Sequence, residues 1–332
     1  MNIHYFSGED WEEKYVREKL SGHTITFHEG PFSAFTGSDD AAEALCIFVE
    51  SKVTEADLAR FPNVELIATR STGYDHIDIA AAHARDITVV NVPFYGENTV
   101  AEFAFALILS LSRRIPEAQA KVRSGVFSPS GLRGFDLNGK TMGVLGTGHI
   151  GAHLIRMAQG FGMKVIAFDA FPNEDIAHTL GFTYMPLTEV LGSSDVISIH
   201  VPYNEHTHHL INKSNIGSIK KGAYLINTSR GAVIETEALV EALKNESLAG
   251  AGLDVLEEEG DMADEMKLMN DSHPKEAEMK TLLENHYLVN HPRVIVTPHV
   301  AFNTLEAVMR IIDATIKNID QYSAGTPENV VK

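Results

Sequence analysis

Three glycines between Met142 and Gly151 have a spacing that suits phosphate binding. Gly146, Gly148 and Gly151 form the pattern G-x-G-x-x-G, directly after an apolar run that predicts a strand and directly before helical sequence. In this pattern the first glycine permits a tight turn, the second lets the backbone approach a pyrophosphate, and the third allows close helix packing. The helix N–H groups would point at the phosphates. The segment predicts a dinucleotide site, and a glycine turn that binds no nucleotide is the alternative.

An acidic residue at the end of the next predicted strand supports the dinucleotide interpretation. Asp169 lies about 20 residues beyond the glycines, where a carboxylate would accept hydrogen bonds from the adenosine ribose hydroxyls. Ala170, Phe171 and Pro172 follow, so no Arg or Lys stands nearby to neutralise a 2′-phosphate, and Asp169 itself would repel one. NAD is therefore the expected cofactor, in preference to NADP.

Charged and ionisable side chains also follow the last three predicted strands. Arg230 comes after "LIN", Asp254 and Glu259 follow "AGAGL", and His299 follows "VIVTP". Because open α/β sheets bind ligands outside the carboxyl ends of their strands, an arginine, a carboxylate and a histidine can converge there. An arginine can grip a carboxylate through two parallel hydrogen bonds. Each also has a plainer interpretation: a surface ion pair for Arg230, a solvated acid for Glu259 and a packed turn histidine for His299.

Two sets of strands would position these residues. Short β-branched runs alternate with helical stretches, a pattern typical of parallel strands joined by helices. The first set ends near Pro93, and the second begins at the glycine segment and supplies six strands of one doubly wound sheet. The predicted strands are NIHYF, ALCIFV, VELIATR, ITVVNVP, TMGVLGTG, KVIAFD, VISIHVP, AYLINTSR, AGAGLDV and RVIVTPH.

The sequence after the last strand holds one helix, Thr304 to Tyr322, which is too short to form a domain. The economical solution returns the chain to the first unit. We therefore predict an α/β protein of two doubly wound parallel-sheet domains, a Rossmann NAD-binding domain inserted into a flavodoxin-like substrate domain. The expected boundaries are 1–98 plus 297–332 for the discontinuous substrate (catalytic) domain and 99–296 for the NAD-binding domain. The chain crossings, near 94–99 and 296–299, can serve as a hinge.

The segment from Asn98 to Gly125 predicts one long helix. Thr99 and Glu102 have the spacing of a capping box at its start. Its apolar surface is broader than a single domain usually needs, so we expect a homodimer through the 99–124 helix region. A helix buried within one chain is the alternative.

Composition narrows the class of partner and the compartment. The chain has 332 residues and a formal net charge of -18, so it would repel nucleic acid and anionic membrane. The first 20 residues lack the basic start and the apolar stretch that predict a signal peptide, and the longest apolar run is shorter than a spanning helix requires. The single cysteine, Cys46, lies in an apolar run, which predicts a buried thiol rather than a nucleophile. These features together predict a cytoplasmic protein.

Five motifs in order give a resemblance that covers nearly the whole chain. They are "MGVLGTGHIG", "HVPYNEHTHHLIN", "LINTSRGAVI", "GLDVLEEE" and "TPHVAF". The set resembles the D-isomer-specific 2-hydroxyacid dehydrogenases, within them the D-lactate dehydrogenase-like branch. Several matches in order are far more specific than any one of them.

The resemblance implies a role for each residue that matches a family motif. Arg230 would bind the substrate carboxylate and polarise the keto oxygen, His299 would donate a proton to that oxygen, and Glu259 would hydrogen-bond His299. Thr72 and Gly73, in "STGYDHID", would receive the carboxylate on backbone amides. Tyr95 and Phe302 would bound a small pocket that suits pyruvate or slightly longer 2-keto acids. The implied cofactor-binding residues are Gly146, Gly148, His149, Ile150, Gly151, Asp169, His200, Val201, Pro202, Thr207, Thr228, Arg230 and Asp254.

Two segments depart from the family pattern or invite another interpretation. The acidic stretch from Glu259 to Pro292 is longer than the common pattern, and we expect an extra helix or two, forming either a solvated face or an added subunit contact. The histidines His206, His208 and His209 could suggest a metal, but the cofactor-loop match explains them and no ligand pattern accompanies them, so no metal is expected.

The favoured function is therefore an NAD-dependent reduction of a small 2-keto acid, with pyruvate first, to the D-2-hydroxy acid. Glyoxylate or hydroxypyruvate reduction within the same family is the near alternative. From a different class, the fold also resembles NAD-sensing corepressors that bind partner proteins.

Overall fold

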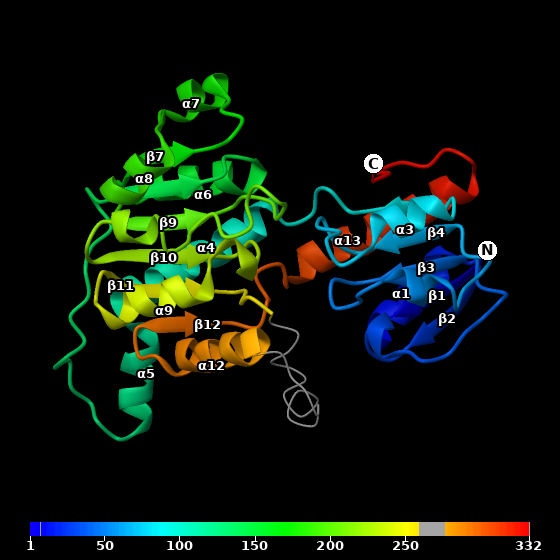
Figure 1. Ribbon diagram of the computed structural model, residues 1–332, viewed down its shortest axis with the longest axis horizontal. Coiled ribbons are helices and arrows are strands. Elements are labelled where there is room, and N and C mark those ends of the chain that lie inside the picture. The colour runs from blue at the N-terminus through cyan, green and yellow to red at the C-terminus, as the bar shows by residue number, and fades with distance from the viewer. Residues whose placement is uncertain (7, 259–275, 332) are drawn as a thin grey trace. The chain divides into compact units, whose positions relative to one another are not determined.

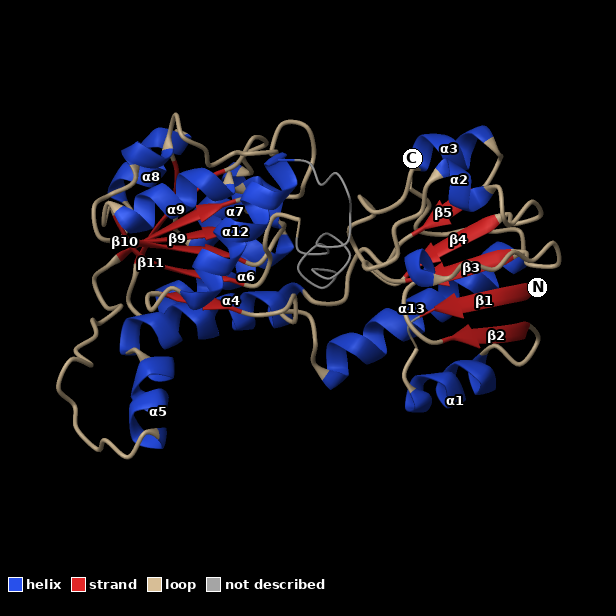
Figure 2. Ribbon diagram, turned by 60° about the horizontal axis from the view of Figure 1, so that its bottom comes forward, coloured by secondary structure: helices blue, strands red, loops and turns tan. Residues whose placement is uncertain are grey.

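The computed structural model describes residues 1–6, 8–258 and 276–331. The chain divides into two compact units, Met1–Tyr95 with Thr304–Lys332, and Gly96–Asn303 (Figure 1). The second unit is thus inserted into the first in sequence, as predicted. Each unit is built on its own parallel sheet (Figure 2).

The first unit contains a five-stranded sheet in the order β2-β1-β3-β4-β5, with every neighbouring pair parallel. This is the flavodoxin-like order, whose ligands bind where the strand order reverses. The strands are β1 (Asn2–Phe6), β2 (Thr24–His28), β3 (Ala44–Ile47), β4 (Leu66–Thr69) and β5 (Thr88–Val90).

Helices cover both faces of this sheet, which explains why every residue of its central strands β3 and β4 is buried. The helices are α1 (Asp10–Lys19), α2 (Glu55–Leu58), α3 (Ile79–Ala84) and α13 (Leu305–Ser323). One core joins the sheet to α1 and α13 through residues such as Val16 and Ile316, and the other joins it to α2 and α3 through Leu58 and Ala82. The C-terminal helix therefore returns to the first unit, as its shortness predicts.

Strand β2 was missed at the sequence level. It lies at the edge of the sheet, and its five residues alternate polar and apolar side chains, of which only Ile25 is buried. An edge strand with a single buried side chain lacks the continuous apolar run that identifies central strands.

The second unit contains seven parallel strands in the order β12-β11-β10-β9-β6-β7-β8. Reading from β8, the order is that of a Rossmann sheet, with its reversal between β6 and β9. The strands are β6 (Thr141–Leu145), β7 (Lys164–Phe168), β8 (Thr183–Tyr184), β9 (Val196–Ile199), β10 (Ala223–Asn227), β11 (Leu248–Leu253) and β12 (Val294–Val296). Six were predicted, and β8 was missed because it is only two residues long.

Two cores hold helices to the two faces of the second sheet. One contains side chains of α4 (Glu97–Arg113), α6 (His149–Gly160) and α7 (Glu174–Leu180). The other contains side chains of α8 (Leu187–Ser193), α9 (Thr236–Lys244) and α12 (Glu276–Asn290). Helix α12 lies in the acidic stretch where extra helix was expected, and the part from 259 to 275 lies outside the described residues.

The single long helix predicted over Asn98–Gly125 is wrong, because the structure contains two helices, α4 and α5 (Ile115–Arg123). They meet at Arg114, whose backbone is left-handed with φ +53°. Pro116 has no N–H to bond the carbonyl of Ser112, and its ring would clash with that carbonyl in a continuous helix. The Ser112 oxygen accepts instead from the Phe135 N–H at 3.0 Å. The proline therefore forces the break.

The start of α4 also differs from the prediction. The N-cap is Gly96 rather than Thr99, so Thr99 lies within the helix, where it is buried. Glu102 accepts a hydrogen bond from the Asn98 side chain at 3.0 Å instead of closing a capping box. The spacing S/T-x-x-E alone therefore does not fix the helix start.

The second chain crossing lies later than the predicted 296–299. The units divide between Asn303 and Thr304, so His299 and Phe302 belong to the inserted unit. The cause is a set of backbone hydrogen bonds from residues 299–301 to Asp254, which bind this segment to the end of β11. No helix in the described ranges combines the length and apolar composition needed to cross a membrane.

Candidate active site

The glycine turn lies at the reversal point of the second sheet. Gly146 has φ +93°, and a Cβ atom there would lie 2.7 Å from the carbonyl carbon of His200, at the end of β9. A Cβ at Gly151 would lie 2.1 Å from the Gly146 oxygen, so the helix packs directly on the turn. A Cβ at Gly148 would meet nothing within 4 Å. The outer side of the turn is therefore open to a ligand.

Helix α6 starts at this turn, with Gly148 as its N-cap. Because glycine has no side chain to cap the helix, the first N–H groups are available to an anion, with the helix dipole favouring negative charge. Ile150 packs against the core, whereas His149 is exposed, with Nδ1 3.5 Å from Glu97 Oε1. The turn thus has the properties of a pyrophosphate site.

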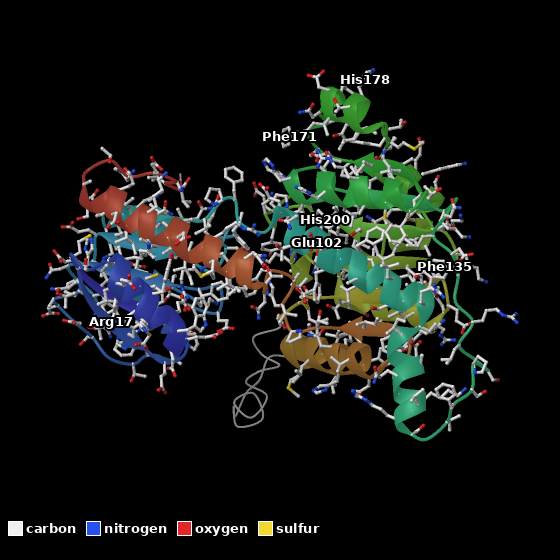
Figure 3. All side chains as sticks on the ribbon, turned by 180° about the vertical axis from the view of Figure 1, so that it is seen from behind. Arg17, Glu102, Phe135, Phe171, His178 and His200 are labelled. Atoms are coloured by element: carbon white, nitrogen blue, oxygen red, sulfur yellow. The ribbon has the colours of Figure 1, made fainter. Side chains whose placement is uncertain are left out.

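Asp169 is held at the end of β7 by three hydrogen bonds. Its Oδ2 accepts from the N–H and hydroxyl of Thr147 at 2.7 and 3.0 Å, and its Oδ1 accepts from the Phe171 N–H at 2.9 Å. Tyr184 is hydrogen-bonded to the Thr147 hydroxyl at 2.6 Å. A carboxylate has about four acceptor positions, so Oδ1 retains one for a ribose hydroxyl. The Phe171 side chain beside it is 89% exposed (Figure 3).

The segment after β9 carries four predicted cofactor residues. His200 is partly buried, with Nε2 2.8 Å from Ser198 Oγ, and burial lowers its pKa to about 4. It is therefore neutral at physiological pH. Val201 packs against the core and Pro202 is exposed. Thr207 donates its hydroxyl hydrogen to the Pro202 oxygen at 2.6 Å, so it closes the loop on itself.

Thr228 supplies an independent test of whether a ligand fits this sheet edge. Thr228 is 8% exposed, and its hydroxyl has no hydrogen-bond partner among the described residues. A buried hydroxyl without a partner carries a cost of about 1–3 kcal/mol. Its position directly after β10 is where an open α/β sheet binds ligands, so a polar group of a bound cofactor would satisfy it.

Arg230 lies in a turn fixed by Asn227. The Asn227 amide donates to the Arg230 oxygen at 2.8 Å and accepts from the Ser229 N–H and hydroxyl at 3.0 and 2.8 Å. A Cβ on Gly231 would lie 1.9 Å from the carbonyl carbon of Leu256, so only glycine permits this approach. The Arg230 turn therefore packs against the chain that leaves β11.

Asp254 shapes the turn that carries His299. Its Oδ1 accepts from the Thr297 hydroxyl at 2.5 Å and the Val300 N–H at 3.0 Å, and its Oδ2 accepts from the Ala301 N–H at 2.8 Å. The His299 N–H donates to the Asp254 backbone oxygen at 2.8 Å, and His299 has φ +52°. Burial raises the pKa of the Asp254 carboxyl, an effect that these hydrogen bonds oppose. Both carboxyl oxygens are engaged with the His299 turn.

The structure therefore brings Arg230 and His299 to one edge of one sheet. They follow β10 and β12, the two neighbours of β11. Glu259, the predicted partner of His299, lies outside the described residues. The nearby Glu257 is fixed by His209 Nε2 at 2.7 Å and by the Thr236 hydroxyl at 2.8 Å.

The histidine cluster has other partners than a metal. The His208 and His209 rings stack with centroids 3.9 Å apart, and His206 is exposed beside Glu205. In the described part of the chain, no group of three His, Cys, Asp or Glu side chains is arranged to hold a metal ion.

The predicted substrate loop lies in the first unit, directly after β4. Thr72 donates its hydroxyl hydrogen to the Val92 oxygen at 2.8 Å, and the Thr72 oxygen accepts from the Asn91 amide at 2.8 Å. The Gly73 oxygen accepts from the Ser71 hydroxyl at 2.6 Å. Tyr95 also belongs to this unit, whereas Phe302 belongs to the other.

Comparison with known proteins decides the family. The sequence model for the D-isomer-specific 2-hydroxyacid dehydrogenase NAD-binding domain matches residues 105–301. The chain belongs to the D-isomer-specific 2-hydroxyacid dehydrogenase family. It is 35% identical to the D-lactate dehydrogenase of Escherichia coli, covering 98% of each chain. It is 36% identical to a 2-hydroxyacid dehydrogenase homolog of Zymomonas mobilis, again covering 98% of each.

A solved structure extends this likeness to three dimensions. The D-lactate dehydrogenase of Aquifex aeolicus, in complex with NAD and lactic acid, superposes with a TM-score of 0.87 at 34% identity, covering 98% of this chain and 96% of that one. This member of the D-2-hydroxyacid dehydrogenase family is an NAD-dependent enzyme. The predictions of family, fold class, enzyme class and cofactor are thereby confirmed.

Several residues that build the site in this D-2-hydroxyacid dehydrogenase were missed at the sequence level. Thr147 hydrogen-bonds Asp169, Tyr184 hydrogen-bonds the Thr147 hydroxyl, and Asn227 holds the Arg230 turn. Thr147, inside the glycine motif, and Asn227, whose hydrogen bonds are to residues two and three positions away, had local signals that could have found them. Tyr184 contacts Thr147 across 37 residues of sequence, so no local signal indicated it.

Proposed function

We propose that this enzyme reduces pyruvate with NADH to D-lactate. The observation that carries the proposal is that the Arg230 turn and the His299 turn follow β10 and β12, the two strands that flank β11 in the NAD-binding sheet. The similarity to D-lactate dehydrogenases of Escherichia coli and Aquifex aeolicus over nearly the whole chain supports pyruvate as the substrate.

The substrate carboxylate and the keto oxygen each have a residue suited to them, Arg230 and His299. NADH supplies a hydride when bound. The Arg230 guanidinium binds the substrate carboxylate through two parallel hydrogen bonds and polarises the keto oxygen. The His299 imidazolium donates a proton to that oxygen, and Glu259 stabilises the imidazolium. In the oxidation direction, neutral His299 accepts the proton.

The cofactor residues divide along the edge of the sheet. The glycine turn binds the pyrophosphate on backbone N–H groups, and Asp169 accepts from the ribose hydroxyls. His200, Val201, Pro202 and Thr207 line the adenine and ribose side. Thr228 binds near the nicotinamide, where its partnerless hydroxyl supports a polar contact. Asp254 acts through the His299 turn that it shapes.

The first unit supplies the substrate carboxylate loop. Thr72 and Gly73 offer backbone N–H groups to the carboxylate, and Tyr95 and Phe302 face the substrate's methyl group. Apolar contacts to this methyl group favour pyruvate and short 2-keto acids over longer ones.

We also propose a homodimer that uses α5 and the loop after it. Ile115, Val122, Val126 and Phe127 expose large apolar surfaces there, and Phe127 is 93% exposed. Helix α4, in contrast, is buried against its own unit and its core. A cluster of exposed apolar side chains is typical of a protein interaction surface.

Steady-state kinetics with NADH test the function. The substrates are pyruvate, 2-ketobutyrate, phenylpyruvate, hydroxypyruvate and glyoxylate, with chiral analysis of the product. We expect the highest kcat/KM with pyruvate and a D product. A preference for glyoxylate or hydroxypyruvate would show that one of these acids, and not pyruvate, is the substrate. Tight NADH binding without any turnover would favour a binding protein.

A matched pair of variants tests the arginine. Arg230→Gln should lose keto-acid reduction while retaining NADH binding, because the carboxylate clamp is removed. Arg156→Gln, at an exposed position on α6 of the same unit, should behave like the wild type. Equal activity in both variants would contradict the clamp.

A further inference from the structure

The loop after β4 has an unusual hydrogen-bond pattern. Among the residues that the structure describes, the backbone N–H groups of Thr72, Gly73 and Tyr74 donate to no protein acceptor. The two carbonyl groups between them are both engaged, by the Asn91 amide at the Thr72 oxygen and by the Ser71 hydroxyl at the Gly73 oxygen. The loop thus has three backbone N–H groups available as donors, while the two carbonyl oxygens between them are already hydrogen-bonded.

The Ser71 hydroxyl belongs to a chain of three side chains. Ser71 Oγ lies 2.7 Å from Thr69 Oγ1, and Thr69 Oγ1 lies 3.0 Å from His76 Nε2. Thr69 and Ser71 are 1% and 2% exposed, so bulk water does not replace either contact. The chain starts at a histidine and ends at the Gly73 carbonyl.

Counting hydrogens fixes the direction of every bond in this chain. The Gly73 carbonyl can only accept, so the single hydroxyl hydrogen of Ser71 is used there. Thr69 must therefore donate to Ser71, which uses its own hydrogen. His76 Nε2 must then carry a hydrogen and donate to Thr69. The order is His76 to Thr69 to Ser71 to Gly73, with no alternative direction.

This order affects the N–H groups of the loop. A hydrogen bond to a peptide oxygen polarises the whole peptide, so the N–H on its other side becomes a stronger donor. The bond to the Thr72 oxygen acts on the Gly73 N–H, and the bond to the Gly73 oxygen acts on the Tyr74 N–H. Two adjacent, polarised and partnerless N–H groups suit an anion.

We propose that His76, acting through Thr69 and Ser71, is a positioning residue for the substrate carboxylate. The chain orients the peptide that joins Gly73 to Tyr74 and strengthens the Tyr74 N–H, a donor beside those of Thr72 and Gly73. It thereby sets the affinity for 2-keto acids without touching them. This inference rests on the proposed function of the loop and extends it to three residues behind the loop.

A matched pair at Thr69 is the first test. Thr69→Val has nearly the same shape but no hydroxyl, whereas Thr69→Ser keeps the hydroxyl. We expect Thr69→Val to raise the KM for pyruvate about tenfold, because a buried hydrogen bond is lost at the carboxylate loop. The kcat, the KM for NADH and the thermal midpoint should change little by comparison, and Thr69→Ser should restore the KM for pyruvate.

A second pair at His76 tests the start of the chain. His76→Gln places an amide N–H donor near the position of Nε2 and should retain a KM close to that of the wild type. His76→Leu has no donor and should behave like Thr69→Val. An unchanged KM in Thr69→Val and His76→Leu, or equal defects in the hydroxyl-free and conservative variants, would overturn the inference.

A binding measurement separates this inference from the proposed function. Titration of oxamate, a carboxylate isostere of pyruvate, into the enzyme–NADH complex reports carboxylate affinity without turnover. Weaker oxamate binding in Thr69→Val supports the chain even when pyruvate is not the substrate, and equal binding in both Thr69 variants and the wild type refutes it. Absence of turnover by the wild type would refute only the proposed function.

Discussion

Acid should destabilise the NAD-binding unit through one histidine. His200 follows β9 and contacts Ser198, and burial lowers its pKa from 6.5 to about 4. In the unfolded chain the same imidazole is exposed to water and titrates near 6.5. Between these values the unfolded chain binds more protons than the folded one, so the free energy of unfolding falls as the pH falls.

The size of this effect follows from the two pKa values. The stabilisation is fully present above pH 6.5 and is lost as the pH falls toward the folded-state pKa of about 4. Complete titration would remove about 3 kcal/mol, at 1.36 kcal/mol for each pKa unit. Between pH 7 and pH 5 the same relation gives a loss of about 2 kcal/mol, which corresponds to a roughly 20-fold change in the unfolding equilibrium.

Hydrogen exchange is the suitable assay, because the only tryptophan, Trp11, lies in the other unit and would not report on this sheet. Protection factors for the amides of β6 and β9, corrected for the intrinsic pH dependence of exchange, measure the opening of the unit. The wild type should lose roughly 20-fold protection between pH 7 and pH 5 through His200. His200→Gln cannot titrate but can still contact Ser198. Its loss of protection over the same pH range should therefore be roughly 20-fold smaller than that of the wild type.

His178→Gln is the matched control. His178 is an exposed histidine on α7 of the same unit (Figure 3), so its removal should leave the pH dependence of the wild type unchanged. The reasoning is refuted if the wild type and His200→Gln lose protection equally over this pH range. It is also refuted if His178→Gln removes the pH dependence as effectively as His200→Gln does.

Three further predictions concern catalysis, cofactor choice and assembly. His299→Ala should lower kcat by about 10²- to 10⁴-fold with an unchanged Kd for NADH, and near-normal turnover would remove the proton-donor role. Asp169→Ala should reduce the ratio of kcat/KM with NADH to kcat/KM with NADPH, and an unaltered ratio would count against the ribose contact. Phe127→Asp should shift a dimer to monomer in light scattering, since a charge replaces a 93% exposed ring, and a dimer that persists would place the interface elsewhere.

The parts of the fold predicted from sequence are those in which one local segment carries the whole signal. Central strands such as β4 and β9 are buried on both faces and are short runs of mostly apolar residues. The glycine turn is equally local, since its requirements are met within Met142–Gly151. Edge strands β2 and β8 are half exposed or very short, so no such run marks them.

The rest could not be predicted because it depends on which segments meet. Asp254 was placed near the nicotinamide on a family motif, but its hydrogen bonds to residues 297–301 appear only when β11 and β12 pair. The break between α4 and α5 had a local signal in Pro116, which was outweighed by the long apolar pattern before it. The apolar side chains of that pattern are buried within α4, so the pattern indicates α4 and not α5.

The inserted architecture gives the C-terminal segment a role that no motif indicates. The Asn318 side chain, on α13, donates to the Asn91 backbone oxygen at 2.8 Å, and the Asn329 side chain donates to Asn318 Oδ1 at 2.8 Å. The Asn91 side chain in turn donates to the Thr72 oxygen. Since that bond polarises the Gly73 N–H, the last helix supports the substrate loop through Asn91. The chain must therefore return to its first sheet before the substrate loop is complete.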